Sequence, residues 1–230
     1  MSDPTLPSSQ SPGADDRLAP AHPAPGGTKP HPHPEHQDRE GAKIGMWLFL
    51  FTEMILFGGL FLLYSAYRAR FPREFASAGA MLDHTLGIVN TLILLTSSLT
   101  VACSITAMAK GSRRLSMGLV AVTVVLAGCF LGVKAVEWST KIHHGLYPSG
   151  PFLATRPPGE VLFFGLYYVT TGLHGLHVIA GAIALLVTLG LAALGRVCPD
   201  DHVVLENAGL YWHLVDAVWI FILPLYYLAV

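Results

Sequence analysis

Charged side chains are scarce in this sequence. Asp, Glu, Lys and Arg make up 13% of its 230 residues and 52% are hydrophobic, whereas a typical soluble domain is roughly 25% charged. The formal net charge is -1 and there is no long basic or acidic run, so nothing favours a nucleic acid or another charged polymer as a ligand. A chain this apolar is predicted to be embedded in lipid.

Cysteine pairs are also missing. Cys103, Cys129 and Cys198 stand far apart and form no CxxC or CxxCH pattern. The first two lie within apolar runs, where cysteine acts as a small hydrophobic residue. The spacing therefore favours neither a disulfide framework nor covalent haem attachment.

The N-terminal segment 1–40 lacks an apolar run and holds more than half of the 16 prolines. Such a composition cannot bury enough apolar surface to offset chain entropy, so we expect a disordered tail before a transmembrane domain at 41–230. No basic start precedes an apolar core, so we expect no cleaved signal peptide. His31, His33 and His36 stand among prolines and could loosely chelate a metal, although a Pro-rich linker explains them more simply.

Apolar stretches of about 20 residues or more follow, each long enough at ~1.5 Å rise per residue to cross a hydrocarbon core of ~30 Å. Backbone groups in lipid must pair within their own segment, and these runs are too long and uniform for barrel strands. The sequence therefore predicts an all-α, polytopic membrane helix bundle with five transmembrane helices. Their expected ranges are 44–67, 84–109, 116–139, 161–195 and 208–230.

Lys and Arg are distributed unevenly between the two sides of these spans. More of them belong to the tail and to the second and fourth connections than to the first and third. The richer side holds Arg17, Lys29, Arg39, Lys43, Lys110, Arg113, Arg114 and Arg196, and the other side holds Arg68, Arg70, Arg73, Lys141 and Arg156. The positive-inside rule then predicts a cytoplasmic N-terminus and a C-terminus on the opposite side of the membrane.

Ionisable side chains stand inside the expected helices at a depth where a charge is costly. Glu53, near the middle of the first helix, has only Thr52 as a polar neighbour, so we expect it to be protonated or paired with another helix. Its role is either proton handling or a structural hydrogen bond. Lys134 and Glu137 are three residues apart on one helical face and are expected to form an ion pair. A proton-relay role for this pair stays open as an alternative.

Histidines cluster in the last two spans. His174 and His177 share a helical face, and His213 precedes Asp216 by three residues. Imidazoles on facing helices could bind haem or copper. An oxygen-reducing centre needs more histidines than these helices offer, however, so we expect no metal in this chain. Hydrogen-bonded structural histidines or ligands of lipid headgroups are the preferred interpretation.

Several of these residues stand in motifs of a known family. The run TGLHGLHV at 171–178 is followed by WHLVDAVW at 212–219, and the segments 47–53, 57–61, 87–91 and 137–138 add WLFLFTE, FGGLF, GIVNT and EW. Over nearly all of 43–230 the sequence resembles subunit III of the haem-copper oxidases, in the short five-helix bacterial form. It lacks the first two helices of the seven-helix form, and its connection at 139–160 looks longer than usual.

The resemblance implies a subunit of cytochrome c oxidase without a redox centre of its own, in a bacterial cytoplasmic membrane with a periplasmic C-terminus. Haem and copper would then belong to partner subunits I and II, and cytochrome c would donate electrons to the complex. Such a subunit packs mainly against subunit I, holds phospholipid in a cleft and sustains proton uptake. By match, Glu53 is the buried acid of the first helix. The expected polar residues of the lipid cleft and bundle interior are Glu137, His174, His177, His213 and Asp216.

Other functions remain as alternatives. A related accessory subunit could serve a quinol oxidase or a nitric oxide reductase. A small haem-binding membrane anchor would use histidines such as His174 and His213. A proton-coupled transporter would use Glu53 and the pair of Lys134 and Glu137, although the sequence lacks the broken helices typical of inverted-repeat transporters.

Overall fold

The computed structural model describes residues 34–148, 150–199 and 201–228. This part of the chain is 86% helical without strands, and it includes five helices long and apolar enough to span a membrane. The predicted fold class is therefore confirmed. The five helices are α1 (Pro34–Arg70), α3 (His84–Ala109), α4 (Arg113–His143), α5 (Pro158–Ala193) and α6 (Val203–Leu223).

Some helix boundaries differ from the predicted ones. α3 begins and ends as predicted, whereas α1 starts at Pro34, inside the segment 1–40 that was expected to be disordered. Proline is tolerated at the first helical position because its missing N–H would have no helical partner there. The predictions for the His31, His33 and His36 side chains lie outside the described residues.

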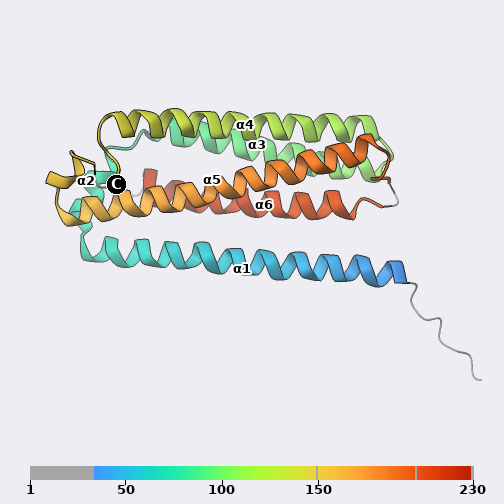
Figure 1. Cartoon of the computed structure of the whole chain (residues 1–230), viewed down its shortest axis with the longest axis horizontal. Coiled ribbons are helices and arrows are strands. Elements are labelled where there is room, and N and C mark those ends of the chain that lie inside the picture. Colours follow the sequence, from blue (N-terminus) through green and yellow to red (C-terminus); the bar gives the residue numbers. More distant parts are fainter. Residues whose placement is uncertain (1–33, 149, 200, 229–230) are drawn as a thin grey trace, which may run out of the picture.

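Four helices form a bundle, and the fifth lies along one side of it. α3, α4, α5 and α6 pack together, and α1 contacts α5 and α6 (Figure 1). The N-terminal end of α1 lies at the same end of the molecule as the α3–α4 and α5–α6 turns. The other end carries the short helix α2 (Pro72–Gly79) and the α4–α5 connection.

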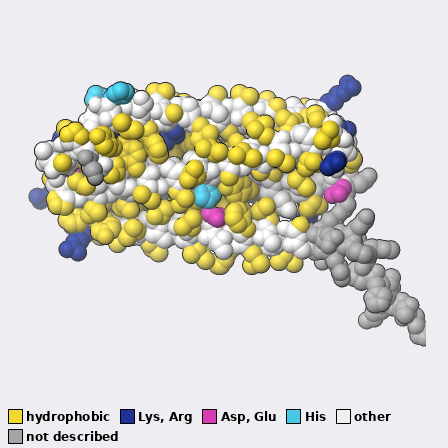
Figure 2. All heavy atoms as spheres, in the orientation of Figure 1, with side chains coloured by type: hydrophobic (Ala, Val, Ile, Leu, Met, Phe, Trp, Pro, Cys, Tyr) yellow, Lys and Arg dark blue, Asp and Glu magenta, His cyan; other side chains and the backbone are white. Residues whose placement is uncertain are grey.

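The surface has the polarity of a membrane-spanning protein. Apolar side chains cover the middle of the visible face, and Lys and Arg side chains gather toward the two ends (Figure 2). Large apolar side chains in the spans are widely exposed, among them Leu62 at 74% and Leu176 at 64%. In water such a surface would drive association, so lipid or partner subunits must cover it.

Two short elements at one end were not predicted from the sequence. α2 and the 3₁₀ turn η1 (Leu153–Thr155) lie in segments that were expected to be loops. The Glu74 carboxylate of α2 accepts a hydrogen bond from the Gly159 N–H, and the Ser77 hydroxyl donates to Glu160 Oε1 at 2.8 Å. These bonds hold the start of α5 against α2 and therefore fix the position of α5 along the bundle axis.

The C-terminal helix changes its geometry at a proline. α6 starts at Val203, earlier than the predicted residue 208, and ends at Leu223, after which Pro224–Leu228 form a π-helical turn, η2. Proline has no N–H to continue the helical bonding pattern, so a wider turn is favoured here. The Tyr64 hydroxyl donates to the Leu225 carbonyl. The turn buries Tyr226 and Tyr227 in the bundle, where their hydroxyls meet α4 and α5.

Glycines terminate two of the helices that lead into tight turns. Gly111 after α3 and Gly195 after α5 both have φ of 79°, a left-handed conformation that side chains other than glycine adopt at a cost. The N–H of the residue after each glycine reaches back to a carbonyl of the last helical turn, from Ser112 to Ala107 and from Arg196 to Leu191. These turns let consecutive spans pack antiparallel.

Candidate functional site: buried polar clusters within the membrane-spanning bundle

The acid of the first helix has a partner on α5. His177 Nε2 lies 2.8 Å from Glu53 Oε2, and both side chains are 15% exposed. The Phe57 ring packs edge-on to the imidazole with centroids 5.2 Å apart, and the Tyr211 hydroxyl donates to the His177 carbonyl at 3.2 Å. Figure 2 shows a histidine and an acidic side chain side by side, surrounded by apolar side chains, near the middle of the visible face.

The hydrogen bonds of His177 define what this pair can do. Its Nδ1 lies 2.8 Å from the Leu173 carbonyl oxygen, which can only accept, so Nδ1 carries a hydrogen. One proton then remains to be shared between Nε2 and the Glu53 carboxyl. The pair can exist as two neutral groups or as an ion pair without any change of partner.

A second cluster joins α4, α5 and η2. Lys134 Nζ donates to Glu137 Oε2 at 2.9 Å, as expected from their spacing, and Lys141 Nζ donates to Glu137 Oε1 at 2.9 Å. The Tyr167 and Tyr227 hydroxyls each donate to Glu137 Oε1 at 2.8 Å. Glu137 therefore accepts bonds from two cations and two phenols while its side chain is only 2% exposed.

Aromatic rings complete the surroundings of Lys134. Its Nζ lies 5.1 Å from the ring centroid of Tyr167, 5.3 Å from that of Trp219 and 5.5 Å from that of Tyr227. A cation desolvated among aromatic faces gains from the negative face of each ring. The three ammonium hydrogens of Lys134 are directed at Glu137, Tyr167 and Tyr227, so all of its donors are used within the cluster.

The remaining predicted polar residues are separated by the fold. His213 on α6 does not pair with Asp216; its Nδ1 lies 2.7 Å from the Ser98 hydroxyl of α3. Ser98 also lies near Asp216, but neither Asp216 oxygen has a partner of hydrogen-bond geometry among the described residues. His174 points into the bundle at 0% exposure, whereas His177 faces α1.

Important partners escaped the sequence analysis. Tyr167 and Tyr227 were not singled out because nothing in a tyrosine within an apolar run shows whether its hydroxyl reaches a buried acid. Lys141 was counted only as a loop charge, although its spacing of four from Glu137 is a usable signal for a helical ion pair. Asn90 stood inside a quoted motif, but its complete burial could not be foreseen.

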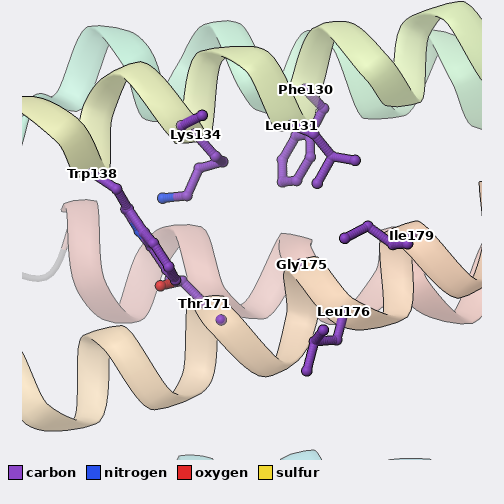
Figure 3. A pocket seen from close by; sticks show the side chains of 10 residues that line it. Phe130, Leu131, Lys134, Trp138, Thr171, Gly175, Leu176 and Ile179 are labelled. Atoms are coloured by element: carbon purple, nitrogen blue, oxygen red, sulfur yellow. The ribbon is translucent and has the colours of Figure 1, made fainter.

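Two apolar grooves run along the membrane-facing surface. One, of about 200 Å³, lies between α1 and α6 and includes Phe57, which packs on His177. The other, of about 260 Å³, lies between α4 and α5, with Trp138 reaching toward α5 at one end and Phe130 and Ile179 at the other (Figure 3). Gly172 makes room for Trp138, since a Cβ there would lie 3.1 Å from the indole ring.

Two of the histidines that were considered as haem ligands have contacts defined by the structure. His174 is fully buried with the Phe130 and Trp219 rings at centroid distances of 5.6 and 5.2 Å, and His213 Nδ1 is bonded to Ser98. Within the described ranges, no group of three or more His, Cys, Asp or Glu side chains could hold a metal ion.

Comparison with known proteins identifies the family of this chain. A family model described as "Cytochrome c oxidase subunit III" matches residues 31–230. The chain belongs to this family. It is an accessory subunit of a haem-copper oxidase, and it is a multi-pass membrane protein.

Three relatives illustrate the range of the family. "Cytochrome c oxidase subunit 3" of Alkalihalophilus pseudofirmus is 34% identical over 198 residues, which cover 85% of this chain and 91% of the relative. "Cytochrome bo(3) ubiquinol oxidase subunit 3" of Pseudomonas aeruginosa is 28% identical over 199 residues, 86% of this chain and 90% of the relative. "Heme-copper oxidase subunit I+III" of Aeropyrum pernix is 31% identical over 215 residues, 89% of this chain and 24% of the relative.

The chain is shorter than some other members. It spans 67% and 64% of two further relatives named cytochrome c oxidase subunit 3, compared with about nine tenths of the relatives from A. pseudofirmus and P. aeruginosa.

Proposed function

We propose that this chain is the non-catalytic subunit III of a proton-pumping cytochrome c oxidase in a bacterial cytoplasmic membrane. It stabilises the catalytic subunit, binds phospholipid and supports proton uptake for oxygen reduction. Haem and copper are held by partner subunits I and II, with subunit I as the main contact. The A. pernix relative supports this contact, because its name places subunits I and III in one chain. The N-terminus is cytoplasmic and the C-terminus periplasmic.

The observation that carries the proposal is the pair of Glu53 and His177. Both side chains remain partly exposed at mid-span, at 15%, where an acid is otherwise costly. The bond from Nδ1 to the Leu173 carbonyl leaves the pair one shared proton, so it can change its charge distribution without moving a helix. A pair of this kind can influence the proton supply of a neighbouring subunit while making no contact with a redox centre.

The grooves beside these residues support the lipid part of the proposal. The groove between α1 and α6 is almost wholly apolar and is lined by Phe57, the residue whose ring packs on His177. An acyl chain lying there would cover the apolar side of the polar pair and exclude water from it. His177 is then a positioning residue for bound phospholipid.

The test uses the intact oxidase with Glu53→Ala. We expect unchanged haem content, because no metal ligand is removed, together with fewer turnovers before inactivation. Glu206→Gln, which changes an acid near the start of α6 that pairs with Lys43, is the matched control and should leave the working lifetime unchanged. Loss of a haem band in the assembled Glu53→Ala complex, or an unaltered lifetime, would contradict the proposal.

A second variant tests the lipid assignment. His177→Ala in the complex should reduce the phospholipid that copurifies, as measured by mass spectrometry of extracted lipid. His144→Ala, at the exposed end of α4, is the control. Equal lipid content in both variants and in the parent complex would remove His177 from the lipid site.

A quinol donor is the second candidate, and the P. aeruginosa relative favours it by its name. The purified complex distinguishes the two donors directly. Oxygen consumption with reduced cytochrome c supports the first proposal. Oxygen consumption with ubiquinol alone would assign the chain to a quinol oxidase.

A further inference from the structure

Several polar side chains in the four-helix bundle have buried polar atoms without partners among the described residues, and in three of them both polar atoms are unpaired. These three are Asn90 on α3, His174 on α5 and Asp216 on α6, with exposed fractions of 0, 0 and 4%. None of their side-chain polar atoms has a hydrogen-bond partner among the described residues. Buried polar atoms in proteins are nearly always hydrogen-bonded, because leaving them unpaired forfeits their bonds to water.

Trp219 relates the three positions to one another. The Trp219 ring lies 5.2 Å from the His174 ring, centroid to centroid, and its indole N–H donates at 3.0 Å to Thr91, the residue after Asn90. Asp216 precedes Trp219 by three residues on the same helix, so the two share a face. His174 therefore contacts Trp219 directly, and Asn90 and Asp216 lie within three residues of Trp219 or of a residue that contacts it.

Burial limits what can satisfy these atoms. Lipids and partner subunits reach only the outside of the bundle, whereas Asn90 and His174 are completely enclosed by this chain. The partner must be small enough to lie between packed helices. It must also both donate and accept hydrogen bonds, because the Asn90 amide and the His174 imidazole each carry a donor and an acceptor, and the Asp216 carboxyl adds further acceptors. Water meets both conditions, and buried water commonly makes about three such bonds.

We propose that ordered water molecules lie within the bundle of α3, α4, α5 and α6 around Trp219, bridging Asn90, His174 and Asp216. They extend the polar interior of the bundle in two directions. On one side, the Trp219 ring contacts Lys134, which belongs to the Glu137 cluster. On the other side, Asp216 lies near Ser98, which is bonded to His213. The result is a hydrated polar column inside an apolar bundle.

Hydroxyl-radical footprinting of the intact oxidase tests this directly, because radicals formed from a bound internal water oxidise the side chains next to it. We expect Trp219 and His174 to be oxidised severalfold faster than Trp212. Trp212 is the matched control: it is also 0% exposed, lies on the same helix and has a paired indole N–H, to Ser97 at 3.0 Å, whereas the Trp219 ring packs against the unpaired His174. Equal protection of both tryptophans, or equal oxidation of both, would overturn the proposal.

A variant and a structure provide independent readouts. Combining Asn90→Leu with Asp216→Leu removes two of the polar partners, so Trp219 oxidation should fall to the level of Trp212 in the assembled complex. Should that variant fail to assemble, a structure of the parent oxidase at a resolution that shows water decides the matter. Water peaks about 3 Å from all three side chains support the proposal. Direct bonds from these side chains to protein atoms, with no water between them, overturn it.

Discussion

Replacing Glu137 by Gln should destabilise this protein more than any comparable single change of charge. The carboxylate accepts hydrogen bonds from Lys134, Lys141, Tyr167 and Tyr227, and the two lysine side chains are only 9% and 7% exposed. Glutamine keeps the volume and one acceptor but removes the only negative charge within bonding distance of both lysines among the described residues. Breaking a buried ion pair in this way typically costs ~3–5 kcal/mol.

The same structure predicts an order among related variants. Lys134→Met leaves Glu137 paired with Lys141, so only the hydrogen bonds of one lysine are lost and a smaller cost of about 1–3 kcal/mol is expected. Glu206→Gln removes an ion pair of equal length, 2.9 Å to Lys43, whose side chains are 31% and 49% exposed. Exposed pairs of this kind contribute at most ~1 kcal/mol.

The free energy of unfolding is measured by denaturant titration of each full-length variant in mixed micelles. The predicted order of destabilisation is Glu137→Gln, then Lys134→Met, then Glu206→Gln. If Glu137→Gln loses no more stability than Glu206→Gln, the cluster is not the buried, charge-compensated network described here.

Three further predictions concern packing, capping and topology. Gly87→Ala should cost about 1–3 kcal/mol of unfolding free energy, because a Cβ there would lie 2.8 Å from the Tyr227 ring. Gly128→Ala should instead gain up to ~1 kcal/mol from helix propensity, because its Cβ would meet nothing within 4 Å. Equal effects of the two variants in the same titration would contradict this packing. Asp83→Ala should cost about 1 kcal/mol, because it removes the acceptor for the Thr85 and Leu86 N–H groups at the start of α3, whereas Asp83→Asn should be nearly neutral by the same measurement. Cys198, exposed in the α5–α6 turn, should react with a membrane-impermeant maleimide only from the cytoplasmic side of sealed vesicles; labelling from the periplasmic side alone would reverse the proposed orientation.

The fold was largely predictable because lipid imposes a strong constraint on sequence. An apolar run of about 20 residues marks each span whatever its neighbours are, which is why α3 matches its predicted range of 84–109. Hydrophobicity predicts helix boundaries less well where the helices extend beyond the hydrocarbon core. α6 continues through Glu206 and Asn207 to Val203, and α2 is held by contacts of Glu74 and Ser77 with α5.

The site was predictable only where partners are close in sequence. The spacing of Lys134 and Glu137 within one helix indicated their ion pair. The partner of Glu53 is His177, 124 residues away, and which helices face one another is set by packing that a single sequence does not display. The partner of His213 is Ser98 on α3, 115 residues away, and it was not predicted for the same reason.

The most direct test of the central claim is to tag this chain, extract it in mild detergent and identify by mass spectrometry every protein that copurifies. The account predicts recovery of a large haem-copper catalytic subunit and a copper-bearing second subunit, with haem absorbance that follows the catalytic subunit when the complex is dissociated. Recovery of this chain alone from well-preserved membranes in several detergents, or haem absorbance that stays with the separated chain, would contradict it.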